Sequence, residues 1–157
     1  MIRRATVVAV GSLRGWAADG ANDYLKRLRR FFPVEVLEVP EEDLNKGTRE
    51  EVLVAEAKRL LRKVPAGAYV VVLDREKGDP LTSEELARRL GSLGLSGLSH
   101  VAFVIGGPLG LSPEVFRRAD SAASFGPITL PHALARVVLL EQLYRAAKIN
   151  RGEKYHY

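Results

Sequence analysis

The stretch HVAFVIGGPLG, residues 100–110, decides how this chain folds. After its leading histidine it is apolar on both faces of an extended chain, which is typical of a central parallel strand covered by helices on both sides. A second run of this kind, YVVVL, occupies residues 69–73. Two such strands, separated by a helical pattern, predict an α/β domain with a mostly parallel sheet and helices on both faces.

Further strands and helices alternate on either side of these two runs. Three more strands are expected, at residues 5–10, at 34–39 as a half-exposed edge strand, and at 121–125. Helical spacing predicts helices at residues 16–32, where Pro33 stops the pattern, and at 131–149. A short helix is expected to begin at Pro113, with Ser112 as its cap.

Two more helices are marked by capping boxes. Thr48 and Thr82 each precede a glutamate by three residues, the spacing that such a box requires. The first of these helices is expected to turn its apolar residues inward, namely Val52, Val54, Ala55, Leu60 and Leu61. The second should end at Gly91 or Gly94, because glycine is favoured just past a helix C-terminus.

The last helix, residues 131–149, carries apolar side chains around most of its circumference. Surface helices confine such side chains to one stripe, so this helix needs a second cover besides the sheet. A homodimer partner would supply that cover, and a helix enclosed within one domain is the alternative. Glu141 and Arg145 form an i,i+4 pair on the remaining polar edge.

Composition limits the class of protein. The 157 residues, with an apolar fraction of 46%, suit a single domain at residues 1–157. No run reaches the roughly 18 apolar residues of a membrane span and no signal-peptide pattern opens the chain, so we expect a cytoplasmic protein without membrane contact. The absence of cysteine excludes disulfides, thiolate metal sites and cysteine nucleophiles. The net charge of +5 suits a polyanionic partner, although genome composition or heat adaptation would also explain it.

Glycine-containing turns follow three of the expected strands. They are Leu73-Asp74 with Gly78, Ile105-Gly106-Gly107, and Phe125-Gly126-Pro127. In an open parallel sheet, ligands bind beyond the carboxyl ends of the strands. Each turn alone would be an ordinary loop, but together they predict a pocket of main-chain donors and acceptors between apolar walls. Neither G-x-G-x-x-G after the first strand nor a P-loop is present, which argues against nicotinamide binding and ATP hydrolysis.

The three histidines, His100, His132 and His156, lack metal-ligand spacing, so no metal site is expected. His100 precedes a strand and is interpreted as structural. His132 stands in the first turn of the last helix, where it could contact a ligand or cap the helix. Tyr155 and His156 lie in a terminal segment that would be disordered by default, but aromatic residues around a histidine also suit stacking on a base.

Taken together, these residues resemble one family, the SPOUT-class methyltransferases of the RlmH type, which modify N3 of a pseudouridine in bacterial large-subunit ribosomal RNA. The resemblance extends along nearly the whole chain. It is carried by residues 8–11 (VAVG), 73–74 (LD), 105–112 (IGGPLGLS), 130–136 (LPHALAR), 141–146 (EQLYRA) and 155–156 (YH). This ordered set is far more specific than any single glycine turn.

The resemblance implies a deep trefoil knot at about residues 68–157, a homodimer, and S-adenosylmethionine as the cofactor. The cofactor contacts that it implies are Leu73, Gly106, Gly107, Phe125, Gly126, Pro127, Ile128, Thr129 and Leu130. Three departures from the family pattern are visible: Ser12-Leu13 lacks a common lysine, Gly126 replaces a frequent serine, and Lys154 replaces a proline. Because the implied contacts are largely main-chain, we expect cofactor binding to survive these changes.

The implied activity is methylation of that pseudouridine in 23S ribosomal RNA, within the ribosome. Tyr155 and His156, contributed across the dimer, would hold the base and assist removal of its weakly acidic imide proton. His132, Arg136 and Arg145 would bind the substrate, with a structural salt bridge as the alternative for Arg145. Two other functions stay open: a SPOUT RNA methyltransferase with another nucleotide target, and a non-catalytic module that binds RNA or the ribosome.

Overall fold

The computed structural model describes residues 1–155, and its centre is one six-stranded sheet. The strands are β1 Arg4–Val10, β2 Val34–Val39, β3 Tyr69–Leu73, β4 Asp79–Pro80, β5 His100–Ile105 and β6 Ser121–Ser124. They lie in the order β2-β1-β5-β3-β6-β4, and neighbouring strands run parallel. The predicted parallel sheet is confirmed, with β2 at an edge; β4, a two-residue strand, was not predicted because so short an element leaves no pattern.

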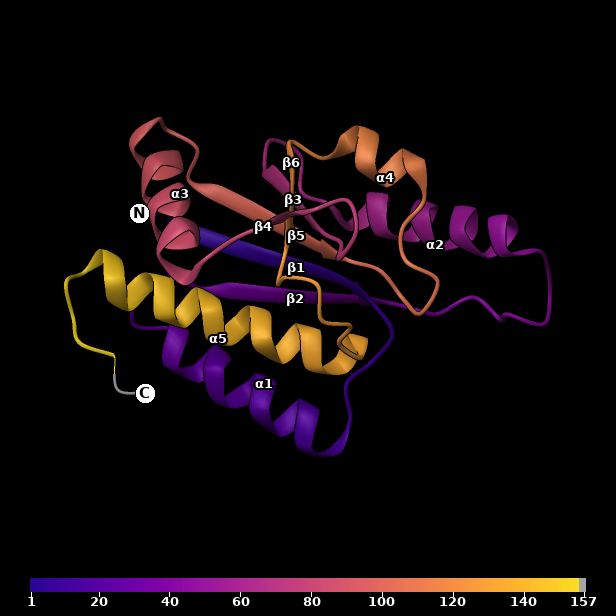
Figure 1. The fold of residues 1–157 in the computed structure, drawn as a ribbon, viewed down its shortest axis with the longest axis horizontal. Helices are drawn as coiled ribbons and strands as arrows, with labels where there is room; N and C mark the ends of the chain where they lie inside the picture. The colour runs from indigo at the N-terminus through magenta and orange to yellow at the C-terminus, as the bar shows by residue number, and fades with distance from the viewer. Residues whose placement is uncertain (156–157) are drawn as a thin grey trace.

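Helices cover both faces of this sheet, as predicted. They are α1 Gly15–Leu28, α2 Arg49–Lys63, α3 Ser83–Leu95, α4 Pro113–Arg118 and α5 His132–Asn150. α1, α3 and α5 share one hydrophobic core with the sheet, while α2 and α4 share the other, and Figure 1 shows α1 and α5 lying side by side. In β5, Phe103 faces the first core and Val104 the second, which is why the strand is apolar throughout.

α1 ends four residues earlier than Phe32, where its helical pattern stops. The N–H groups of Phe31 and Phe32 both donate to the carbonyl oxygen of Leu28, which closes the helix in a tight turn. Phe32 is buried, so its side chain contributes to the core from this turn rather than from a further helical turn. The apolar periodicity therefore continued past the real end of the helix.

α3 runs through both glycines that were expected to end it. A Cβ atom at Gly94 would lie 2.5 Å from the carbonyl oxygen of Met1, so glycine is needed there because the N-terminus of the chain crosses the helix. Gly91 faces the side-chain amide of Asn150, at the end of α5. These two glycines thus serve close packing, which sequence spacing cannot distinguish from a helix stop.

The two predicted capping boxes differ in the structure. At Thr82 the box is complete, because its hydroxyl accepts from the Glu85 N–H while the Glu85 carboxylate accepts from the Thr82 N–H. This hydrogen bonding lowers the pKa of Glu85. At Thr48 only the first half forms, and the Glu51 carboxylate accepts from the Thr48 hydroxyl instead.

Among residues 1–155, no helix combines the length and apolar character needed to cross a membrane.

The inward face of α2 was only partly predicted. Val52 and Leu60 are buried as expected, but Val54 is 40% exposed. Glu56 occupies the buried side instead, with only 3% of its surface exposed. The prediction for Val54 was wrong because it considered apolar character alone. The side of α2 that faces the sheet is determined by all the contacts of the helix together.

Candidate active site

A pocket opens at the carboxyl ends of β3, β5 and β6, where the three glycine-containing turns were predicted to gather. The pocket is open to solvent, and its cavity measures about 180 Å³, less than the roughly 300–1,000 Å³ typical of small-molecule sites. The predicted cofactor residues that line it are Leu73, Gly106, Gly107, Phe125, Gly126, Ile128 and Leu130. Pro127 and Thr129 lie outside this lining, on the exposed loop after β6.

The turn after β5 forms one wall of the pocket. Gly107 and Gly110 face each other in an isolated antiparallel bridge, and the Gly110 N–H donates to the Gly107 carbonyl oxygen at 3.0 Å. A Cβ atom on Gly106 would collide with the carbonyl group of Gly110, so only glycine fits there. Gly110 has a φ of 87°, a left-handed conformation that favours glycine. The pocket is therefore bounded here by main chain.

The turn after β6 is held by Ser124, a residue that sequence reasoning missed. Its buried hydroxyl accepts from the Gly126 N–H at 2.9 Å and donates to the Gly126 carbonyl oxygen at 3.1 Å. Gly126 has a φ of 95°, and a Cβ there would meet no atom within 4 Å. A serine two residues before a glycine at a strand end is the signal that could have identified this turn.

The turn after β3 adds charged groups to the pocket wall. The Asp74 carboxylate accepts from the N–H groups of Glu76 and Lys77, at 3.1 and 2.8 Å, and so fixes the turn. Arg75 also lines the pocket and donates to the carbonyl oxygen of Pro127 at 3.5 Å. These contacts tie the turn after β3 to the loop after β6, which makes Pro127 part of the frame around the pocket.

His132 lies on the wall of this same pocket, as the predicted substrate contact requires. Its Nε2 is 3.9 Å from Oε1 of Glu41, in the segment that follows β2. The N-cap position of α5 is Pro131, and no side chain caps the helix there, so the alternative role of His132 as a cap is not what the structure shows.

Arg136, a predicted substrate contact, is buried with 3% of its surface exposed. Its Nη1 donates to the Gly11 carbonyl oxygen at 3.0 Å, and its Nη2 pairs with Oε2 of Glu38 at 2.5 Å. The same Glu38 oxygen accepts from the N–H of Leu13. In this structure, Arg136 therefore ties α5 to the end of β1 and to β2, and its guanidinium is turned away from solvent.

Tyr155 and Arg145 meet outside the pocket, beside the second half of α5. The Tyr155 hydroxyl donates to Oε1 of Glu141 at 2.9 Å, and Arg145 pairs with the same carboxylate at 2.7 Å. The Arg145 guanidinium also lies over the Tyr155 ring, 4.0 Å from its centre. Burial and the hydrogen bond to Glu141 raise the pKa of Tyr155 to about 12. His156, the other predicted catalytic residue, lies outside the described residues.

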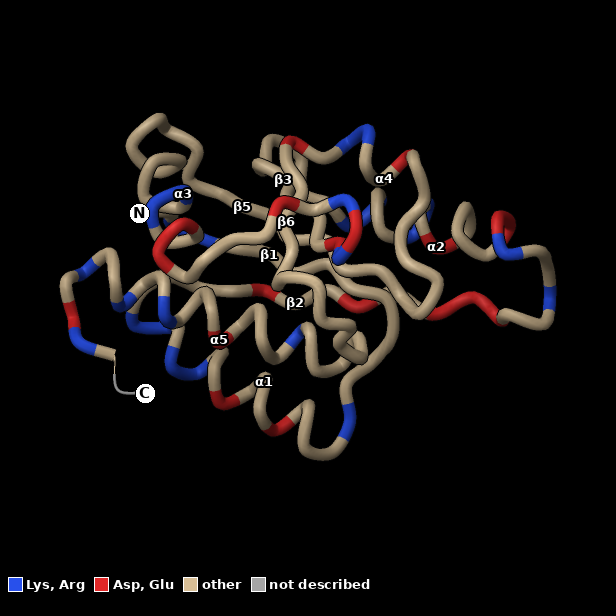
Figure 2. The backbone as a smooth tube through the Cα atoms, viewed as in Figure 1, with Lys and Arg blue, Asp and Glu red and all other residues tan. Residues whose placement is uncertain are grey.

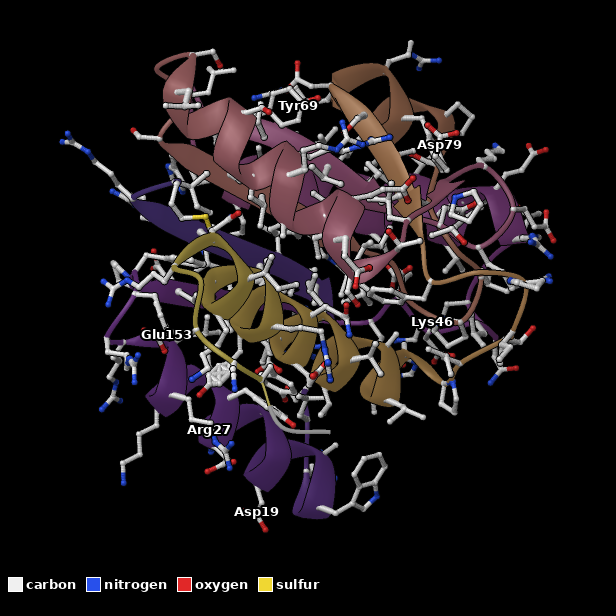
Figure 3. The ribbon with its side chains drawn as sticks, turned by 60° about the vertical axis from the view of Figure 1, so that its left-hand side comes forward. Asp19, Arg27, Lys46, Tyr69, Asp79 and Glu153 are labelled. Carbon is white, nitrogen blue, oxygen red and sulfur yellow. The ribbon has the colours of Figure 1, made fainter. Side chains whose placement is uncertain are left out.

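The segment before Tyr155 is anchored by Glu153, labelled in Figure 3. Its carboxylate pairs with Lys148 of α5 at 2.9 Å and with Arg30 just after α1 at 2.5 Å. Hydrogen bonds from these two cations lower the pKa of Glu153. Glu153 thus ties the segment after α5 to both α5 and the end of α1. Within the described part of the chain, no group of three or more histidine and carboxylate residues is arranged to hold a metal ion.

Comparisons with known proteins agree with this architecture. A family model described as "Predicted SPOUT methyltransferase" matches residues 3–156. A relative from Rubrobacter xylanophilus, named Ribosomal RNA large subunit methyltransferase H, is 70% identical over 158 residues and covers 100% of both chains. A relative of the same name from Moorella thermoacetica is 47% identical over 156 residues, covering 96% of this chain and 97% of its own.

Solved structures share the fold at much lower identity. A "probable methylase family protein" from Haemophilus influenzae Rd KW20 has a TM-score of 0.53 at 12% identity, over 98% of this chain and 70% of its own. A "probable methyltransferase" from Bordetella pertussis Tohama I has a TM-score of 0.52 at 17% identity, over 93% and 96%. The fold match, the family model and the full-length relatives point the same way, and the chain belongs to the SPOUT methyltransferase family.

Proposed function

We propose that this chain transfers a methyl group from S-adenosylmethionine to N3 of a pseudouridine in bacterial 23S ribosomal RNA. The observation that carries the proposal is the 70% identity, over the whole chain, to a protein named Ribosomal RNA large subunit methyltransferase H. The pocket at the three strand ends supports it, because it offers a site for a small cofactor where open parallel sheets bind their ligands.

The residues of the pocket fit this cofactor in kind. Leu73, Ile105 and Leu111 offer apolar surface for a purine ring, while the turns at Gly106 and Gly126 allow a ligand to approach the main chain closely. When bound, S-adenosylmethionine supplies an electrophilic methyl group on a sulfonium centre. The residues of the protein hold the acceptor nitrogen in line with this methyl group and take up the proton of the nitrogen. Of these two effects, orientation contributes more to the rate.

The proposed catalytic roles follow from where the ionisable groups lie. The ordinary pKa of a tyrosine hydroxyl is about 10, so Tyr155 is a neutral hydrogen-bond donor at physiological pH once it is released from Glu141. It is therefore suited to orient the base rather than to accept its proton. His156 remains the proposed proton acceptor. His132, on the pocket wall, is proposed to contact the RNA, as is Arg145 once Tyr155 leaves it.

The proposed homodimer accounts for the separation of the two site halves. Tyr155 and Arg145 do not line this pocket, so the partner subunit is the proposed source of these groups, Tyr155 from its tail and Arg145 from its α5. Leu134 and Val138 of α5 remain half-buried, which leaves apolar surface for such a partner. The family relationship also supports the proposed trefoil knot in residues 68–157, within a single domain at residues 1–157.

The substrate is tested with ribosomes from a bacterial strain that lacks this modification. We expect the purified protein to transfer labelled methyl groups from S-adenosylmethionine to the 23S RNA, at a single pseudouridine. A methyl group mapped to another nucleotide would favour a SPOUT enzyme with a different target. Failure to bind S-adenosylhomocysteine in calorimetry would favour the non-catalytic RNA-binding module.

The tail is tested by deleting residues 155–157. We expect methyl transfer to fall by about 100-fold or more, because base orientation and proton removal are both lost, while affinity for S-adenosylhomocysteine stays unchanged. Lys154→Ala is the control, since it alters the tail without removing the proposed groups. Mixed dimers of the deleted subunit and a subunit that cannot bind cofactor should regain activity if the tail acts across the dimer. Unchanged turnover after the deletion would refute the role of the tail.

A further inference from the structure

Glu56 is a buried carboxyl group at the edge of the core, close to the charged side chains of Glu41, Glu42 and Arg59. It lies on α2 next to the buried Ala57, and its surface is 3% exposed. Isolated buried carboxyl groups are costly, because burial removes water from a charged group. Its presence in the core therefore calls for a physical reason, and the proposed reaction does not otherwise use it.

The two oxygens of this carboxyl differ in their surroundings. Oε2 accepts a hydrogen bond from the N–H of Glu42 at 3.0 Å. Oε1 is buried and, among the described residues, has no hydrogen-bond partner. A Cβ atom built on Gly107 would lie 3.5 Å from this Oε1. The unpartnered oxygen therefore faces Gly107, whose other side lines the pocket.

The loop that Glu56 faces also contains the other unpartnered buried group of the described residues. Ser112 ends the loop that begins at Gly106, and its hydroxyl is buried without a hydrogen-bond partner. Ser112 occupies the N-cap position of α4, yet its side chain makes no capping bond. Both unsatisfied side-chain groups thus belong to this loop or face it, which marks the loop as the place where polar contacts remain to be made.

The charges around Glu56 favour its neutral form. Burial raises its pKa above the ordinary value, and the nearby carboxylates of Glu41 and Glu42 raise it further. The N–H of Glu42 and the guanidinium of Arg59 oppose this, but Arg59 is already bound to Glu42 at 2.9 Å and to the carbonyl oxygen of Pro40 at 3.0 Å. Figure 2 shows the run of acidic residues between β2 and α2 that creates this environment.

We propose that Glu56 is a positioning residue for the methyl donor, which supports the Gly106–Ser112 loop from behind the pocket. The N–H of Glu42 holds Oε2, which leaves Oε1 as the atom that packs against Gly107. The inference rests on the proposed function, since it assumes that the pocket holds S-adenosylmethionine.

The test compares Glu56→Gln and Glu56→Ala by calorimetry with S-adenosylhomocysteine. Glutamine keeps the shape of the side chain, so we expect its affinity to remain within about threefold of the parent protein. Alanine removes the contact with the loop and leaves a void, and we expect an affinity loss of about tenfold or more. Glu50→Gln, an exposed glutamate of the same helix, is the matched control and should change neither affinity nor stability.

The pH dependence separates positioning from simple packing. A carboxyl whose pKa is raised in the folded state binds its proton more tightly there than in the unfolded chain, so its contribution to stability falls as pH rises above 4.5. Glu56→Gln cannot ionise, and its melting temperature should exceed that of the parent protein more at pH 8 than at pH 5. Its affinity for S-adenosylhomocysteine should also vary less with pH.

Several outcomes would overturn the inference. If Glu56→Ala lowers the melting temperature but binds S-adenosylhomocysteine as tightly as the parent protein, Glu56 serves only the core. If Glu56→Gln loses as much affinity as Glu56→Ala, a side chain of this shape does not support the loop. If the parent protein itself does not bind S-adenosylhomocysteine, the proposed function fails first and the inference falls with it.

Discussion

Gly106→Ala is expected to weaken binding of S-adenosylhomocysteine by about 100-fold or more, because small displacements of groups that hold a ligand have effects of this size. The added methyl group would collide with the carbonyl group of Gly110 and would lie 2.9 Å from Cδ2 of Leu111. The carbonyl group of Gly110 cannot withdraw easily, since it belongs to the main chain and the Gly110 N–H is bonded to Gly107. The turn must therefore move, and it forms a wall of the pocket.

Gly91→Ala is the matched control for this variant. A Cβ atom there would lie 3.6 Å from Oδ1 of Asn150, which is an ordinary contact, and the residue is inside α3. Alanine in a helix interior is favoured over glycine by roughly 0.5–1 kcal/mol, so this control should unfold at the same or a higher temperature. A folded Gly106→Ala protein that binds S-adenosylhomocysteine as tightly as the Gly91→Ala control would show that the pocket is not the cofactor site.

The sheet was predictable because the residues of its strands indicate by themselves which strands are buried. β3 and β5 are apolar on both faces, and the structure indeed buries them between two layers of helices. The pocket followed from the same step, since three strand ends with glycines had to meet at one edge of a parallel sheet. Local patterns thus determined which elements form and where a ligand can approach.

What sequence reasoning missed depends on contacts between distant parts of the chain. Glycine is required at position 94 because the N-terminus of the chain crosses α3 there. On α2, Glu56 lies on the buried side, while Val54 is exposed. Arg75 and Ser124 line the pocket through bonds across a turn that only the folded chain defines. Apart from the serine–glycine spacing at Ser124, no spacing rule contains this information, because each of these positions would be unremarkable in another fold.

Arg136 shows the same limit for a charged residue, and its role can be measured. An arginine near the start of the last helix was interpreted as a contact to RNA, but its partners Glu38 and Gly11 lie 98 and 125 residues away in sequence. We expect Arg136→Met to lower the free energy of unfolding by about 2–3 kcal/mol, less than the roughly 3–5 kcal/mol for a fully buried pair. We expect the smaller loss because the Glu38 side chain is 36% exposed and can be hydrated once Arg136 is gone.

A double-mutant cycle with Glu38→Gln should isolate this ion pair. Losing both partners should cost less than the sum of the two single changes, because Arg136→Met then leaves no carboxylate behind. Arg27→Met is the control: Arg27 pairs with Asp23 at 2.9 Å on the exposed face of α1, and its loss should leave unfolding nearly unchanged. Equal losses for Arg136→Met and Arg27→Met in urea titrations would contradict a structural role for Arg136.

Salt dependence of RNA binding separates this role from the phosphate contact. A side chain that neutralises one phosphate contributes about one unit to the slope of binding affinity against salt concentration, on logarithmic scales. Arg136 is 3% exposed and already bonded to Glu38 and Gly11, so Arg136→Met should leave that slope unchanged while it lowers stability. A slope reduced by about one unit with stability intact would mean instead that the guanidinium leaves its buried partners to bind RNA.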